Sequence, residues 1–143
     1  MKVDEAKGEM KRMNEARIKK GRAIRKAGFG PAGEKRWEML NALDPGHAES
    51  VLDYCFGTVW ARPGLDMKYR SLIVIAVAAA SNVPEEVEMH TRGALNRGAT
   101  REEIIETIVQ CSPYIGFPKT NHALQAAKRV FDQWEERKDW HAE

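Results

Sequence analysis

Apolar residues recur every three or four positions through most of the chain, which is the spacing of one face of an α-helix. The clearest case follows Thr100, where Ile104 and Ile108 stand at helical spacing. Thr100 and Glu103 form a capping box, and Ala99 and Ile104 are placed as its hydrophobic staple. No stretch shows a convincing strand pattern or tandem repeat, so the chain is predicted to be all-α.

A second helix is predicted from Met67 to about Ser81, with Asp66 as its N-cap. Its segment Leu72–Ala80 is apolar on every face of the helix. The β-branched residues there would also suit a strand, but the alanines and the helical flanks favour a helix. A helix without a polar face belongs at the centre of a fold, so we expect this helix to be the central element.

Glycine and proline mark the ends of the remaining helices. Pro84 opens a helix that Gly98 closes at its C′ position, and another helix begins near Pro118. Two shorter helices precede them, at residues 37–43 and 51–60. Together the segments predict a single-domain bundle of six to seven α-helices.

The N-terminal segment differs from the rest in pattern and in charge. A helix is predicted from about Asp4 to Lys26, but its apolar stripe is thin, and glycines and a proline between positions 28 and 33 break it. The first 36 residues hold 12 Lys/Arg against 5 Asp/Glu, whereas the remainder holds 11 against 16. The chain is therefore expected to comprise a basic helical arm (1–36) that lies on an acidic partner surface such as a second copy, a helical domain (37–136) and a charged tail (137–143).

The bulk composition is that of one soluble globular domain. The 143 residues are 31% charged and 43% hydrophobic, and the longest apolar run is too short to span a bilayer. No export signal pattern is present, so we expect a cytoplasmic protein without a membrane partner. The basic arm lacks a base-reading motif or interleaved aromatic residues, so nucleic acid is not expected either. Cys55 and Cys111 are read as small core hydrophobes, and no cluster of metal ligands appears in the sequence.

His90 is the residue whose position points to chemistry. It shares a helical stripe with Val83, Val87 and Ala94, and Glu86 lies one turn before it. A titratable base beside a carboxylate at the edge of a core is a common basis of proton transfer. The alternative is a buried histidine that a neighbouring carboxylate satisfies.

Four stretches together resemble the carboxymuconolactone decarboxylase family, in particular its gamma-carboxymuconolactone decarboxylases. The resemblance implies an alkylhydroperoxidase D-like helical fold, a homo-oligomer (trimer or hexamer) and no cofactor. The implied reaction is the decarboxylation of gamma-carboxymuconolactone to an enol-lactone in protocatechuate breakdown, a part of aromatic catabolism. The resembling stretches, which lie within residues 51–131, are Phe56–Asp66, Tyr69–Ala76, His90–Ile104 and Gly116–Asn121.

The sequence departs from its relatives at positions that bear on activity. The peroxidase branch of the fold carries a Cys-x-x-Cys pair where this chain has Val83 and Glu86, and without two thiols its cycle does not run. The decarboxylases usually have a histidine at Gly33 and a cysteine at Ile115. Two alternatives therefore stay open: a decarboxylase or isomerase for another small carboxylated substrate, and a non-catalytic oligomeric binding protein.

The resemblance also implies roles for individual residues. His90 is expected to be the proton donor or oxyanion partner, with Glu86 orienting its ring and raising its basicity. Arg70 or Arg62 is expected to bind a carboxylate of the substrate. The alternative for both arginines is a surface ion pair. Trp60 is expected to form a pocket wall, and the alternative is that it is a core residue. The remaining candidates for substrate binding are Asn121 and His122 at the start of the last helix, where free backbone N–H groups favour anions.

Overall fold

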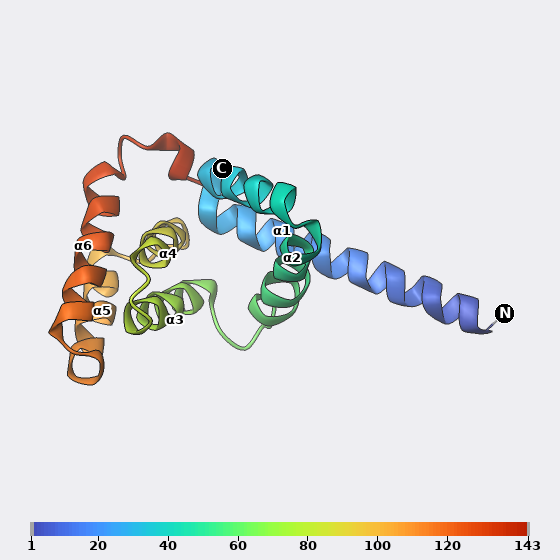
Figure 1. Ribbon diagram of the computed structural model, residues 1–143, viewed down its shortest axis with the longest axis horizontal. Coiled ribbons are helices and arrows are strands. Elements are labelled where there is room, and N and C mark those ends of the chain that lie inside the picture. Colours follow the sequence, from blue (N-terminus) through green and yellow to red (C-terminus); the bar gives the residue numbers. More distant parts are fainter. Residues whose placement is uncertain (1, 143) are drawn as a thin grey trace.

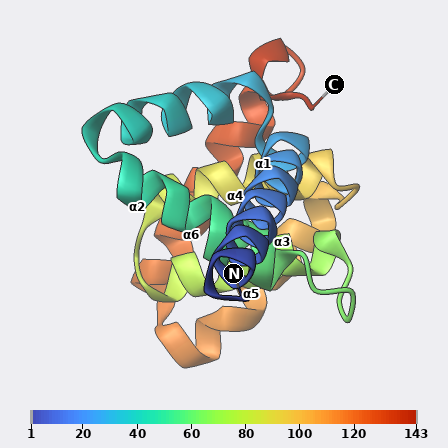
Figure 2. The ribbon, with the colours of Figure 1, turned by 90° about the vertical axis from the view of Figure 1, so that its right-hand side faces the viewer.

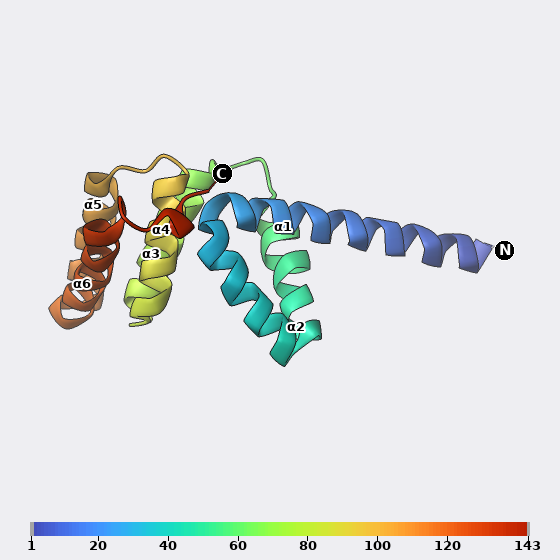
Figure 3. The same cartoon turned by 90° about the horizontal axis from the view of Figure 1, so that it is seen from above.

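A sharp break in the first helix determines how the N-terminal third of the chain is arranged. In the computed structural model, which describes residues 2–142, α1 (Lys2–Leu43) turns back at Gly30, whose φ of 60° and ψ of −166° are not helical. Pro31 follows and has no N–H to continue the helical hydrogen bonds. Figure 3 shows the two segments of α1 meeting at this kink. The sequence placed the break across positions 28–33, but Gly28 and Gly33 are helical and buried.

The buried guanidinium of Arg25 holds the two segments of α1 together. Arg25 is 5% exposed, and its Nη1 donates to Glu34 Oε1 at 2.9 Å. Its Nη2 donates to the Gly33 carbonyl at 2.6 Å. The charge in the first segment is thus neutralised by the carboxylate of the second, which stabilises the bend.

After the kink the chain leads into a continuous helical stretch that returns to the first segment of α1. Asp44 caps α2 (Pro45–Ser50), and the π-helix η1 (Val51–Trp60) follows without a break. Figure 2, which looks along α1 from its N-terminal end, shows the second segment of α1 leading into α2. Phe29, Phe56 and Trp60 form a hydrophobic cluster between α1 and η1.

The rest of the chain is a four-helix unit with its own core, which confirms the all-α prediction. Figure 1 shows α3 and α4 between the α1 side of the molecule and the pair α5 and α6. Asp66 caps α3 through Lys68 N, and the Thr100 capping box of α5 is present as predicted. The helices are α3 (Met67–Ala80), α4 (Pro84–Asn96), α5 (Arg101–Ile115) and α6 (Phe117–Gln133).

The helix expected to be the central element, α3, packs against α4, α5 and α6, but one of its apolar faces is exposed in the single chain. Ile75 is fully buried, but Ile73 is 52% and Val77 is 57% exposed. Tyr69, Ile73 and Val77 are spaced one helical turn apart and form a single apolar stripe that the other helices leave open. Within residues 2–142, no helix is both long enough and apolar enough to cross a membrane.

The C-terminal segment is anchored rather than a free charged tail. It forms η2 (Lys138–Trp140), and Trp140 is 7% exposed. Asn96 at the end of α4 donates from Nδ2 to the carbonyls of Gly28 and Trp140, both at 2.8 Å. One amide thus connects the C-terminal segment, α4 and the last turn before the kink of α1.

The beginning of α1 extends away from the bundle. Figures 1 and 3 show this segment projecting beyond the other helices. Met10 and Met13 on it are 63% and 55% exposed. Further along α1, Arg17 forms an ion pair with Asp53 of η1, with Nε 2.6 Å from Oδ1.

Candidate active site

His90 lies in the middle of α4 and points toward α1 and η1. Its side chain is 7% exposed and contacts the edge of the Phe29 ring, with centroids 5.2 Å apart and planes at 90°. It also stacks on Trp60, with centroids 6.0 Å apart and planes at 25°. Val87 and Ala94, which share its predicted stripe, belong instead to the core of α3–α6. His90 thus occupies the boundary between the two hydrophobic clusters.

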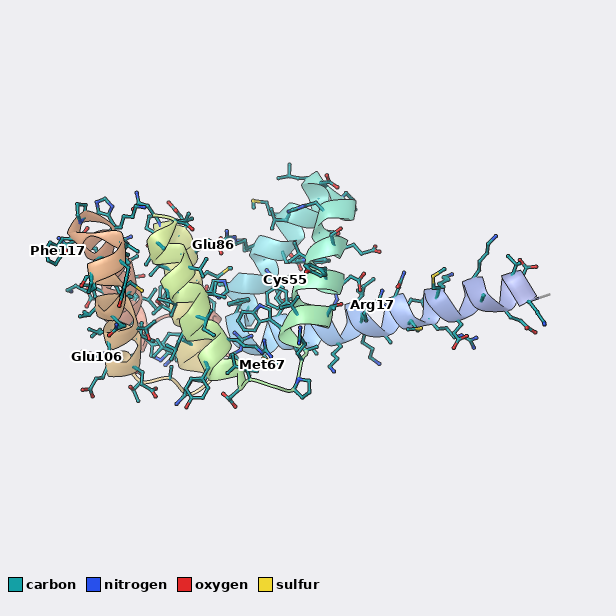
Figure 4. The ribbon with its side chains drawn as sticks, turned by 90° about the horizontal axis from the view of Figure 1, so that it is seen from below. Arg17, Cys55, Met67, Glu86, Glu106 and Phe117 are labelled. Carbon is teal, nitrogen blue, oxygen red and sulfur yellow. The ribbon has the colours of Figure 1, made fainter. Side chains whose placement is uncertain are left out.

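Glu86 lies one turn before His90, as the sequence indicated, but its main partner is an arginine. Arg36 from the second segment of α1 donates from Nη2 to Glu86 Oε1 at 2.6 Å. The distance from His90 Nε2 to Glu86 Oε2 is 3.7 Å, which is too long for a hydrogen bond. Figure 4 shows Glu86 on the side of α4 that faces α1 and η1.

The imidazole of His90 is neutral at physiological pH. Burial is the largest cause, and the positive charges of Arg97, Arg36 and Arg92 add to it, so the pKa of His90 is lowered to about 3. The expectation that Glu86 would raise the basicity of His90 is therefore wrong, because Glu86 is already paired with Arg36. The Nδ1 atom of His90 is buried and has no hydrogen-bond partner in the described chain.

Arg97 completes the site and was not predicted from the sequence. It stands two helical turns after His90, and its Cζ lies 4.7 Å from the Trp60 ring centroid and 5.4 Å from that of Phe29. Its Nη1 donates to Ser71 Oγ at 3.1 Å and its Nη2 to the Ile24 carbonyl at 3.0 Å. Burial lowers the pKa of Arg97 to about 10, so it stays charged.

One stripe of α4 and its C-cap thus carries the site: Glu86, His90, Gly93 and the C-cap residue Arg97. Gly93 provides the room, because a Cβ there would lie 2.8 Å from a Phe29 ring carbon and 3.1 Å from Arg97 Nη1. The i, i+7 spacing of His90 and Arg97 was visible in the sequence. An arginine at a helix C-cap is ordinarily an exposed charge, so the sequence gives no signal that this one is buried.

Trp60 and Arg70, two of the predicted binding residues, lie around one cavity. It measures about 150 Å³. Trp60 connects this cavity to the site, because its ring also packs on His90 and Arg97. Arg70 uses Nε for the Leu65 carbonyl at 3.1 Å and Nη2 for the Arg62 carbonyl at 2.8 Å, so it holds the turn before α3. The lining residues are Val59, Trp60, Leu65, Arg70, Ile73 and Val74.

The other predicted binding residues lie away from this cluster. Arg62 is exposed in the turn before α3. Asn121 and His122 are exposed near the start of α6, and His122 Nδ1 is 3.0 Å from Asn82 Oδ1. Figure 1 shows α6 on the opposite side of α4 from α1, whereas His90 points toward α1. The fold therefore groups His90, Glu86 and Trp60 and separates them from Asn121 and His122.

Comparison with known proteins shows which family the chain resembles. The sequence profile of the carboxymuconolactone decarboxylase family matches residues 45–129. A 4-carboxymuconolactone decarboxylase of Acinetobacter baylyi is 37% identical over 119 residues, which are 82% of this chain and 89% of that protein. A nitrosuccinic acid decarboxylase of Metarhizium robertsii is 36% identical over 84 residues, 59% of each chain. An uncharacterised 15.0 kDa protein of Paracoccus denitrificans is 36% identical over 112 residues, 76% of this chain and 83% of that one.

Proposed function

Since the chain belongs to the carboxymuconolactone decarboxylase family, we propose that it is a carboxy-lyase that converts gamma-carboxymuconolactone to an enol-lactone and CO2. The observation that carries this proposal is the buried, unpartnered Nδ1 of the neutral His90, which lies in the positive field of Arg97, Arg36 and Arg92. A site of this kind is suited to an anion that needs a proton.

The substrate provides its own electron sink. When the bond between the ring carbon and the carboxylate breaks, the electron pair spreads through the ring double bond to the lactone carbonyl and gives a dienolate. Protonation of the dienolate at the ring carbon next to the lactone carbonyl, not at the carbon that lost CO2, then gives the enol-lactone. The chemistry needs carboxylate binding, stabilisation of the oxyanion and return of one proton, all of which side chains can supply without a cofactor.

We assign the return of the proton to His90. Its pKa is low in the free protein mainly because the side chain is buried, and the positive charges of Arg97, Arg36 and Arg92 lower the pKa further. A bound anion offsets that positive field and raises the pKa of the imidazole, so His90 takes up a proton when the substrate binds. The imidazolium then donates this proton to the dienolate and is protonated again from solvent. Glu86, which Arg36 holds in place, is a positioning residue in this scheme.

A second candidate substrate is another small carboxylic acid, and the packing at Gly33 favours it. The resembling decarboxylases usually carry a histidine at this position. Here a Cβ on Gly33 would collide with the Cβ of Phe29, so a larger side chain has no room. Nitrosuccinic acid is the acid named for one of the relatives, and it is the second substrate to assay.

The assay of first choice is CO2 release from enzymatically generated gamma-carboxymuconolactone. Wild type and His90→Gln are compared side by side, and nitrosuccinic acid is tested in parallel. Turnover that falls at least about a hundredfold in the variant would support both the reaction and the role of His90. Turnover of nitrosuccinic acid alone would favour the second candidate, and turnover of neither acid would contradict the proposed activity.

We further propose that the protein is a homo-oligomer, a trimer or hexamer, in which the arm of one copy lies on another. Supporting this, the arm projects from the bundle with Met10 and Met13 exposed. The positive charge of residues 1–36 lies in residues 17–36, because the projecting residues 2–16 hold four Lys/Arg and four Asp/Glu. The exposed methionines, and not the charge, therefore support a contact of the projecting part. The exposed apolar face of α3 around Ile73 and Val77 is available for the same assembly. The cytoplasmic location expected from the sequence stays a prediction.

A further inference from the structure

Arg97 has no carboxylate partner within the described residues, unlike the nearby Arg25 and Arg36. Arg25 is neutralised by Glu34 and Arg36 by Glu86, each through a charged hydrogen bond. Within residues 2–142, no such bridge is made by Arg97, although burial is strong enough to lower its pKa to about 10. A desolvated guanidinium without a counterion is costly for a fold, so its presence calls for an anion that arrives later.

The two hydrogen bonds of Arg97 leave most of its donors free. A guanidinium has five N–H groups, and the bonds to Ser71 Oγ and to the Ile24 carbonyl use two of them. Contacts with the rings of Trp60 and Phe29 hold the charged plane in a defined orientation. A fixed plane with free N–H groups is the geometry that binds a carboxylate.

The ligand that reaches Arg97 also reaches His90. Both side chains pack against the same two rings, and the field of Arg97 is the largest charge effect on His90. Arg97 is only partly buried, so a ligand has access to it from solvent.

We propose that Arg97 binds the carboxylate that the substrate keeps, and not the one that leaves as CO2. This inference rests on the proposed function. The reason is energetic: charge flows out of the departing carboxylate in the transition state, so an arginine on that group would stabilise the reactant more than the transition state. An arginine on the retained carboxylate binds both states equally and leaves the departing group beside the apolar rings.

The test is a binding experiment that does not depend on turnover. The probe is the lactone without the departing carboxyl group but with its acetate arm, and the control ligand is the methyl ester of that arm. Both are titrated calorimetrically into wild type, Arg97→Met and Arg97→Lys. Arg129→Met serves as the matched control, because Arg129 pairs with Glu88 on the α6 side of α4.

We expect Arg97→Met to weaken binding of the acid at least about tenfold, with binding of the ester unchanged. Its melting temperature should be unchanged or higher, because an unpaired buried charge is removed. In turnover, KM should rise about tenfold or more while kcat changes only a few-fold. Unchanged acid binding in Arg97→Met, or an equal loss for acid and ester together with a lower melting temperature, would overturn the proposal.

Two further outcomes separate this inference from the proposed function. If wild type turns over neither acid but binds the probe through Arg97, the proposed reaction fails and the carboxylate site stands. If Arg97→Met does not fold, the test is the preference of Arg97→Lys for the acid over the ester. Lysine keeps the positive charge but lacks the planar guanidinium that binds a carboxylate through two N–H groups. That preference should fall, and an unchanged preference would count against the site. Absence of probe binding to wild type would also overturn it.

Discussion

His90 of α4 and Arg97, the C-cap residue of the same helix, pack against the same two aromatic rings, Phe29 and Trp60. This arrangement places a permanent positive charge next to a base in a dry environment. Burial, with the charge of Arg97 adding to it, keeps the base neutral, and its Nδ1 has no partner within the described residues. An anionic ligand satisfies both groups at once, which connects the electrostatics of the free protein to the proposed chemistry.

Replacing His90 with glutamine should abolish most turnover but leave the fold intact. Glutamine keeps a polar group of similar size but does not titrate, so kcat for CO2 release should fall at least about a hundredfold. Circular dichroism and the oligomer mass should match those of wild type. His47→Gln is the matched control, because His47 is exposed at the start of α2 and its turnover should equal that of wild type. A His90→Gln variant with wild-type turnover would contradict the assignment.

Substrate binding should be accompanied by proton uptake at neutral pH. The pKa of His90 is about 3 in the free protein, and an anion bound among Arg97, Arg36 and Arg92 raises it. Calorimetry in two buffers of different ionisation enthalpy should give uptake of up to about one proton per site. The uptake should disappear in His90→Gln. Equal binding enthalpies for wild type in both buffers would show that His90 does not gain the proton.

His90 should make the folded protein less stable in acid. Its pKa is about 3 when folded and 6.5 when unfolded, so the unfolded state binds more protons between these values. Stability is therefore complete above about pH 6.5 and falls as the pH drops toward 3, by up to about 5 kcal/mol. Urea unfolding at pH 7 and pH 4.5 should show a smaller difference for His90→Gln than for wild type. The same difference in both proteins would mean that other groups cause the acid sensitivity.

Removal of the Arg25 guanidinium should loosen the kink of α1. Arg25→Met leaves Glu34 and the Gly33 carbonyl without their donor, and we expect a loss of about 2–4 kcal/mol in the free energy of unfolding. The exposed pair of Lys128 and Asp132 is the control, since Lys128→Met should cost less than about 1 kcal/mol. Chemical denaturation of both variants measures this directly. Equal effects would indicate that Arg25 contributes little to the bend.

Deletion of residues 2–16 should lower the mass of the assembly. This cut removes the projecting part of α1 and spares Arg17, which bonds to Asp53, and the buried Gly21 and Arg25. Light scattering should report fewer subunits or a concentration-dependent mass. Met10→Ser together with Met13→Ser keeps the length and charge of the arm and tests the apolar contribution separately. An unchanged mass after the deletion would rule out a role of the arm in assembly.

The sequence by itself determined the local features of this protein. Asp66, the Thr100 capping box and Gly98 marked helix ends correctly, because a cap satisfies backbone groups within one turn of its own position. The prediction of an all-α bundle followed from the same local periodicity. The residues resembling the family likewise identified it, which the family profile then confirmed.

Only the tertiary structure decided which neighbours each helix receives. The kink at Gly30 brings Phe29 and Arg36 to α4. Arg36 pairs with Glu86, and the charges that act on the pKa of His90 are those of arginines. The same packing buries Arg97, which the sequence presents as an ordinary charge at a helix end, and leaves Ile73 exposed. These outcomes depend on contacts between residues far apart in the chain. Burial and the electric field at a side chain are properties of such contacts, and helical periodicity carries no information about them.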